Sequence, residues 1–320
     1  MTRILSLVFA IAFITGSPMF GQFTVPDAAF TARLNVLVPS AMNGNVLNTS
    51  DPSVLGLTYM NVAGAGIYDL DGIQYFTGLQ ELVCNGNYLA TLPALPDAIL
   101  RLECQSNDLV SITSLPASLT HLQCWDNQLT NLPALPASLE WLVCYNNQLT
   151  ALPSLPNSIT EIACMDNALN GLPALPASLG RLLCGNNPLL GTMPALPAGL
   201  TELSCGNNGL SALPALPAGL IQLNCDNNVL TALPTLPTSL VDLNCDLNLL
   251  TVLPALPAAL ENLKCTQNQL TVLPALPASL RHLICYNNSL TGLPTLPNGL
   301  SVLECLNNPI GVLPTLPDSL

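Results

Sequence analysis

The sequence has 320 residues, of which 50% are hydrophobic and only 8% are charged. Six basic residues stand against nineteen acidic ones, which gives a formal net charge of −13 at pH 7. Because proteins bind nucleic acids largely through Lys and Arg at the phosphates, this balance excludes a nucleic-acid partner and disfavours an anionic membrane surface. The hydrophobic residues are separated by polar residues and 29 prolines, so no internal run approaches the roughly 18 to 20 residues that span a bilayer.

The N-terminal residues 1–22 predict a secretory signal peptide. Arg3 supplies a short basic region, the apolar core runs from Ile4 to Ile14, and small or turn-forming residues follow. We expect cleavage near Gly21 or Gln22, and hence a secreted or bacterial cell-surface protein. An uncleaved membrane anchor is the alternative, but the apolar core is too short to cross a bilayer. We therefore expect no membrane insertion after the signal is removed.

Residues 23–56 differ in composition from the rest and predict an N-terminal cap. Asp27 can accept a hydrogen bond at the start of a short helix in which Phe30, Leu34 and Leu37 share one side. The end of a stacked repeat array exposes a hydrophobic cross-section, and a helix of this kind covers it.

Residues 57–78 form an irregular first repeat, and residues 79–320 form twelve regular repeats of 20 residues. The regular repeats follow the frame LxxLxCxxNxLxxLPxLPxx. Their cysteines lie twenty residues apart, with a single interval of twenty-one, at Cys84, Cys104, Cys124, Cys144, Cys164, Cys184, Cys205, Cys225, Cys245, Cys265, Cys285 and Cys305. Because the sequence stops at Leu320, halfway through a repeat, we expect a truncated C-terminus without a cap.

Repeats this short have no room for a strand, an α-helix and two turns, and the two prolines of LPxLP break a helix. The segment around each cysteine predicts a strand, and stacking the strands in parallel gives a sheet. The expected fold class is a β-rich solenoid, a horseshoe with a parallel concave sheet and a small helical N-terminal cap. Its convex side is either extended and polyproline-like or a 3₁₀ helix.

The cysteines predict a buried column of small hydrophobic side chains. Disulfides between neighbouring strands are an alternative in an exported protein, although cysteines in register on parallel strands strain the bridge. Zinc sites require close cysteine pairs, which are missing. Asp226, Asp242 and Asp246 have two interpretations, a calcium site or an acidic face exposed to solvent, and the second is favoured because calcium needs six to eight oxygen ligands. No metal and no cofactor are therefore predicted. The asparagine three residues after each cysteine predicts an inward amide that bonds to the backbone of adjacent turns.

The motif LPxLPxxLxxLxCxxNxLT resembles that of bacterial short-repeat leucine-rich-repeat proteins. Its cysteine-bearing form, as in LVCNGNYLATLP and LQCWDNQLTNLP, is similar to secreted or surface proteins of the kind carried by type IX secretion. More distantly, the frame resembles the YopM and IpaH effector families. The IpaH resemblance implies a remote alternative, the repeat portion of an effector ubiquitin ligase lacking its catalytic domain. Cys124-Trp125-Asp126 and Cys164-Met165-Asp166 match the Cys-x-Asp motif of that domain.

Residues that flank the inward leucine and cysteine alternate onto the concave face, so this face predicts the ligand-binding residues. These are Trp125, Trp141, Tyr145, His121, Met165, Arg101 and Arg181. We expect exposed rings to anchor a protein or glycan and the arginines to meet an anionic group of that ligand. With two histidines and no catalytic constellation, we expect no enzyme activity. The alternative function is a structural or adhesive surface spacer whose activity lies in missing C-terminal parts.

Overall fold

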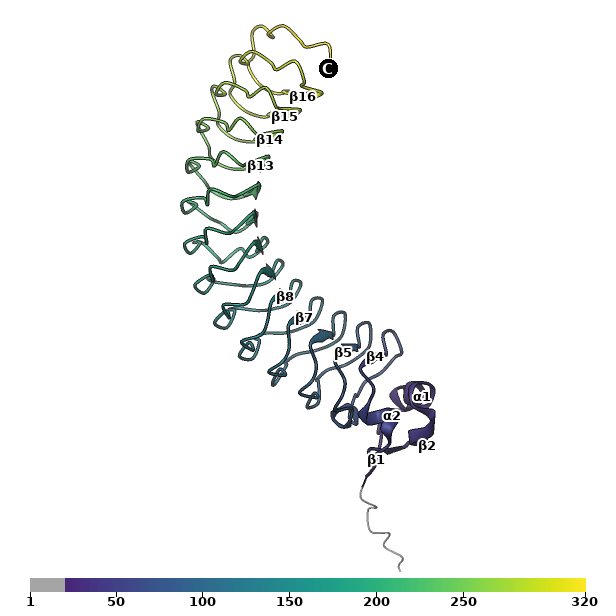
Figure 1. Ribbon diagram of the computed structural model, residues 1–320. Helices are drawn as coiled ribbons and strands as arrows, with labels where there is room; N and C mark the ends of the chain where they lie inside the picture. The colour runs from purple at the N-terminus through teal and green to yellow at the C-terminus, as the bar shows by residue number, and fades with distance from the viewer. Residues whose placement is uncertain (1–20) are drawn as a thin grey trace, which may run out of the picture.

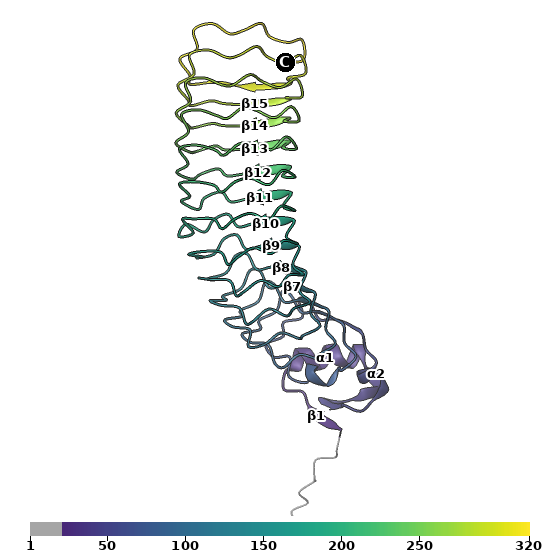
Figure 2. The ribbon, with the colours of Figure 1, turned by 60° about the vertical axis from the view of Figure 1, so that its left-hand side comes forward.

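The computed structural model describes residues 21–320, which form a single curved solenoid (Figure 1). The predicted signal peptide, residues 1–22, lies outside the described residues except for its last two. The cap stands at the N-terminal end of the array, with helices α1 (Ala28–Leu37) and α2 (Pro52–Leu55) beside the first repeats (Figure 2). Within residues 21–320 the longest helix has 10 residues, and no helix is long and apolar enough to cross a membrane.

The cap is built on helix α1 (Ala28–Leu37). The carboxylate of Asp27 accepts a hydrogen bond from the backbone N–H of Phe30 at 2.8 Å, so the predicted N-cap is confirmed. Phe30 and Leu34 are fully buried, and Leu37 packs against the same core. The helix therefore covers the end of the array as its hydrophobic side predicts.

A small antiparallel sheet, which the pattern did not predict, completes the cap. Its strands are β1 Gln22–Thr24, β2 Met42–Asn43 and β3 Val46–Asn48, in the order β1-β3-β2. The other short elements of the cap and first repeat are η1 Pro39–Ala41, α2 Pro52–Leu55 and η2 Ile73–Tyr75. The second carboxylate oxygen of Asp27 accepts hydrogen bonds from the backbone N–H groups of Tyr68 and Asp69, at 2.8 and 3.2 Å. Asp27 thereby ties the cap to the first repeat.

Thirteen parallel strands form one continuous sheet on the inner side of the curve (Figure 1). The strands are β4 Tyr59–Asn61, β5 Glu81–Val83, β6 Arg101–Glu103, β7 His121–Gln123, β8 Trp141–Val143, β9 Glu161–Ala163, β10 Arg181–Leu183, β11 Glu202–Ser204, β12 Gln222–Asn224, β13 Asp242–Asn244, β14 Asn262–Lys264, β15 His282–Ile284 and β16 Val302–Glu304. Equivalent residues pair across neighbouring strands, as in Arg101 with His121 and His121 with Trp141. The predicted solenoid with a parallel concave sheet is confirmed.

The convex side of the regular repeats is extended, so the first of the two predicted alternatives is correct. Each LPxLP segment runs without helix and closes in a turn, in which the N–H of Leu119, for example, donates to the carbonyl of Pro116 at 3.1 Å. The two prolines explain this, because they remove backbone donors that a helix needs. A 3₁₀ helix, η2, occurs instead in the irregular first repeat.

The cysteine and asparagine columns fill the interior as predicted. Eleven of the twelve cysteines are buried, Cys305 is half-buried, and all are free thiols. The amide nitrogen of Asn147 donates to the carbonyls of Cys124 and Cys144, each within 3.2 Å. Its oxygen accepts from the N–H of Leu129 at 3.0 Å. Each such asparagine therefore joins its own turn to the preceding one and satisfies backbone groups that would be unpaired in the bend.

The residue before each of these asparagines has left-handed backbone. The non-glycine examples have φ between 49° and 58° and are Ser106, Asp126, Asn146, Asp166, Asn186, Asn207, Asn227, Leu247, Gln267, Asn287 and Asn307. Asn and Asp tolerate this conformation best among residues other than glycine. The first polar residue of the pairs in CxNN and CxDN is therefore explained by the left-handed backbone at that position. Leu247 occupies the same position but is poorly suited to this backbone conformation.

Candidate ligand-binding face

The concave face presents three rows of side chains, which we number in chain order along each strand. The first row precedes the inward leucine of each strand and contains Arg101, His121, Trp141, Glu161, Arg181, Glu202, Gln222, Asp242, Asn262 and His282. The second row follows that leucine and contains Glu103, Gln123, Val143, Ala163, Leu183, Ser204, Asn224, Asn244, Lys264 and Ile284. The third row follows each cysteine and contains Gln105, Trp125, Tyr145, Met165, Gly185, Gly206, Asp226, Asp246, Thr266 and Tyr286.

Four of the predicted ring side chains meet in pairs across adjacent repeats. Trp125 and Tyr145 stack in the third row, with ring centroids 5.0 Å apart and planes at 10°. His121 and Trp141 contact edge to face in the first row, with centroids 5.5 Å apart. Met165 continues the third row beyond Tyr145. The sequence register therefore predicted these neighbours correctly, and we call the five residues the aromatic patch.

The rings of the aromatic patch are half-buried rather than fully exposed. The indole N–H of Trp141 is buried and has no hydrogen-bond partner within residues 21–320, so this ring offers a ligand its apolar surface. The hydroxyl of Thr120 donates to the carbonyl of Leu100, and the Nδ1 atom of His121 lies 2.8 Å from that hydroxyl. This contact fixes the orientation of the His121 ring beside Trp141.

The two predicted arginines already have carboxylate partners on the concave face, which argues against their binding an anionic group of a ligand. Arg181 contacts Glu161 at 2.7 Å and Glu202 at 2.8 Å. Arg101 lies 2.8 Å from Glu103 and 3.7 Å from Glu81. Each arginine faces two carboxylates, and each cluster carries one net negative charge. The clusters therefore repel an anion at both ends of the aromatic patch.

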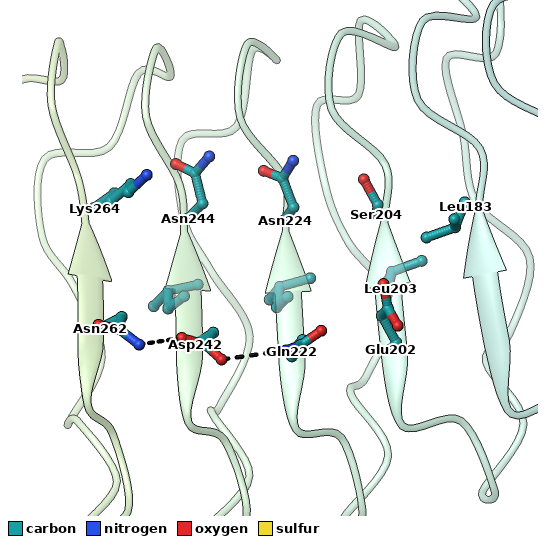
Figure 3. Close-up of a pocket in the computed structure, with 12 residues that line it drawn as sticks. Leu183, Glu202, Leu203, Ser204, Gln222, Asn224, Asp242, Asn244, Asn262 and Lys264 are labelled. Carbon is teal, nitrogen blue, oxygen red and sulfur yellow. Dashed lines mark hydrogen bonds between the residues drawn. The ribbon is translucent and has the colours of Figure 1, made fainter.

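A polar pocket of about 360 Å³ lies further along the sheet, over β10 to β14 (Figure 3). Its first-row wall is a chain of hydrogen bonds in which Gln222 and Asn262 both donate to the carboxylate of Asp242. His282 continues the chain by contacting the side-chain oxygen of Asn262. The second-row wall is formed by Ser204, Asn224, Asn244 and Lys264. This pocket was not predicted from the sequence, where the large aromatic and charged residues of the concave face stand out. Its signal in the sequence is the set of amide side chains at matching positions of consecutive repeats.

The aspartates considered for calcium lie in two different rows, and the cysteines of the two Cys-x-Asp matches are buried. Asp242 lies in the first row and Asp226 and Asp246 in the third, and within residues 21–320 no three His, Cys, Asp or Glu side chains gather around a common point. Burial raises the pKa of Cys124 and of Cys164 to about 12. The thiolate is the nucleophilic form of cysteine, and at neutral pH the thiols of both Cys-x-Asp matches are therefore protonated.

The chain resembles solved structures of bacterial proteins built from the same fold. YopM from Yersinia pestis, a leucine-rich effector protein, is 31% identical over 93% of this chain and 94% of that chain, with a TM-score of 0.68. YopM from Yersinia enterocolitica is 33% identical with a TM-score of 0.67, and the match covers 76% of this chain but only 59% of that chain. The functional domain of InlJ from Listeria monocytogenes, which includes a cysteine ladder, is 23% identical over 90% of this chain and 71% of that chain, with a TM-score of 0.59. No protein-family model and no curated protein match the sequence.

The parallel sheet, the asparagine column and the one-strand repeats define a leucine-rich-repeat protein. The sequence identity to YopM, which extends over nearly the whole of both chains, identifies the family within this class. The chain belongs to the family of bacterial leucine-rich-repeat proteins that includes YopM. The likeness to InlJ shows a shared fold.

Proposed function

We propose that this protein is exported from a bacterial cell, is released or held at the surface, and binds a protein or glycan through its concave face without catalysing a reaction. The similarity to YopM, described as an effector, supports export and a recognition role. The cysteine-bearing repeat, which resembles cargo of type IX secretion, supports the surface of a Gram-negative cell as the destination.

The aromatic patch is the observation that carries this proposal. Aromatic side chains are the commonest anchors of protein interfaces and also pack against sugar rings. Stacking of Trp125 on Tyr145 holds both rings in place before a ligand arrives, so less conformational entropy is lost on binding. Two arginine clusters with net negative charge flank the patch, which favours a neutral or basic ligand surface.

Screening residues 23–320 against protein and glycan arrays tests the proposal, followed by affinity measurements on whatever binds. Trp125→Ala and Trp141→Ala should each weaken binding by about 2 kcal/mol or more, which is roughly thirtyfold. Tyr286→Ala is the matched control, because Tyr286 occupies the third row seven repeats after Tyr145. Equal affinity of both Trp variants and the control would remove the aromatic patch from the binding site.

A further inference from the structure

We propose that the polar pocket over β10 to β14 is a subsite for the uncharged sugar units of a glycan. This inference rests on the proposed function, because it names the ligand class for one part of the same concave face. At about 360 Å³, the pocket has the size of a small-molecule site. Polar side chains form two parallel rows across the strands, the first row before the inward leucines and the second row after them (Figure 3).

The second-row wall presents two fixed hydrogen-bond donors. The side-chain oxygen of Asn224 accepts from the backbone N–H of Asp226 at 3.3 Å, and that of Asn244 accepts from Asp246 at 3.2 Å. These bonds orient both amides, and they leave each NH₂ group facing away from the turn. Because neighbouring parallel strands lie about 4.8 Å apart, the two donors form an evenly spaced pair.

The first-row wall presents acceptors instead. Gln222 and Asn262 direct their NH₂ groups to the carboxylate of Asp242, which fixes that carboxylate and leaves its remaining lone pairs and the oxygen of Gln222 facing the pocket. A carboxylate accepts at about four lone-pair positions, of which two are used here. A hydroxyl group both donates and accepts, so a ligand with several hydroxyls can bond to both walls at once.

The pocket carries an excess of negative charge, which disfavours an anionic ligand. Two carboxylates, Glu202 and Asp242, and one ammonium group, Lys264, line it, and Glu202 also contacts Arg181 at 2.8 Å. Among the described residues, no Trp, Tyr, Phe or Met lines the pocket, so it lacks the large anchors typical of protein hot spots. These properties together fit a sugar better than a peptide or a phosphate.

A second hollow connects the polar pocket to the aromatic patch. This hollow of about 300 Å³ shares Ser204 and Asn224 with the pocket and runs over Gly185 and Gly206 to Met165. A side chain at Gly206 would collide with the carboxylate of Asp226 as it now lies, so glycine at this position leaves both the carboxylate and the hollow undisturbed. A glycan chain bound in the pocket can therefore extend toward the stacked rings of Trp125 and Tyr145.

Titration calorimetry of the purified chain with neutral hexasaccharides of glucose, mannose, galactose and xylose tests this inference, with hexagalacturonic acid as the anionic counterpart. At least one neutral hexasaccharide should bind with a Kd of about 1 mM or tighter, and the acidic one at least about tenfold more weakly. Asn224→Asp and Asn244→Asp replace a donor by an acceptor while retaining the bond to the backbone, and each should weaken binding about tenfold. Asn244→Ala removes the donor without adding charge and should give a similar loss.

Asn157→Asp and Asn157→Ala are the controls, because Asn157 is exposed in a convex turn, and thermal unfolding verifies that every variant is folded. Failure of all neutral hexasaccharides to bind overturns the inference, as does binding that the Asn224 and Asn244 variants leave unchanged. Tighter binding of the acidic hexasaccharide overturns it too. A protein ligand that loses affinity in the Trp variants, while no sugar binds, would overturn the sugar subsite and leave the proposed function standing.

Discussion

Interior and concave positions of the same repeats differ in how freely their residues change along the chain. All twelve regular repeats keep the cysteine and the asparagine that follows it, whereas the first row alone contains Arg, His, Trp, Glu, Gln, Asp and Asn. The interior positions make the same contacts in each turn, so one solution is repeated. The concave positions contact solvent, and folding does not dictate them. The interior residues of each repeat therefore determine the fold, whereas the concave residues are free to determine what the protein binds.

Raising the pH should have the largest effect on folding stability, because the many buried thiols of the interior all contribute to it. Burial raises the pKa of Cys124 to about 12, whereas a thiol in the unfolded chain has a pKa of about 8.5. The unfolded chain therefore binds fewer protons above that pH, and stability falls as pH rises from about 8.5 toward 12. At pH 9.5 the loss should be about 1.4 kcal/mol for each fully buried thiol.

Urea unfolding at pH 7.5 and 9.5 under reducing conditions measures this loss. Replacing Cys124, Cys144 and Cys164 by Ala should reduce the difference between the two pH values, whatever the variant costs at pH 7.5. Equal stability at both pH values in the wild-type chain would show that burial does not raise the pKa of these thiols.

A charged side chain in place of a buried leucine should destabilise the neighbouring repeats more than distant ones. Leu142 is fully buried in β8, and Leu142→Asp buries an unpaired carboxylate, which should cost about 3–5 kcal/mol. Hydrogen exchange should quicken first in the repeats on either side and least near Leu303, because each repeat contacts only its neighbours. Thr130→Asp, at an exposed position outside the strands, is the control. Uniform loss of protection along the chain would contradict this local coupling.

Removal of one asparagine should cost less. Asn147→Ala abolishes bonds to three carbonyls and one N–H group, and the buried groups left unpaired should destabilise the chain by about 2–4 kcal/mol. Asn157→Ala, at an exposed convex position, should change stability by less than about 0.5 kcal/mol. If chemical denaturation finds the two variants alike, the asparagine column is not what joins the turns.

The smallest expected effect is a gain in stability. Leu247 has a φ of 52° and is 42% exposed, so its left-handed backbone is unfavourable and its side chain gains little burial in return. Leu247→Asn should stabilise the chain by about 0.5–1 kcal/mol. In the preceding repeats the same position forms a ladder in which Asn227 donates to Asn207 at 3.1 Å, and the introduced amide would extend this ladder by one turn. Asn227→Leu should have the opposite sign in the same thermal unfolding experiment.

The sequence predicted the interior well and the surface incompletely. The period of the cysteines was enough to predict strand register, and with it the contacts of Trp125 with Tyr145 and of His121 with Trp141. The ion pairs of Arg181 with Glu161 and Glu202 were not predicted, although all three residues lie in the first row. The arginine was interpreted as a partner for a ligand and not for its neighbours in the row. The left-handed position was missed because several residue types occupy it. The polar pocket depends on side-chain orientation, which a period alone does not determine.

Oxidative footprinting of side chains, with and without the ligand returned by the arrays, tests the central claim that recognition lies on the concave aromatic patch. Trp, Tyr, Met and His are all reactive in this experiment, and the chain supplies its own control in Tyr68 and Tyr88. These rings also stack, with centroids 4.9 Å apart, but lie outside the three rows, with exposed fractions of 67% and 53%. The account predicts that the ligand slows oxidation of Trp125, Trp141, Tyr145 and Met165 and leaves Tyr68 and Tyr88 unchanged. Shielding of Tyr68 and Tyr88, with the concave rings still oxidised at the free rate, would contradict it.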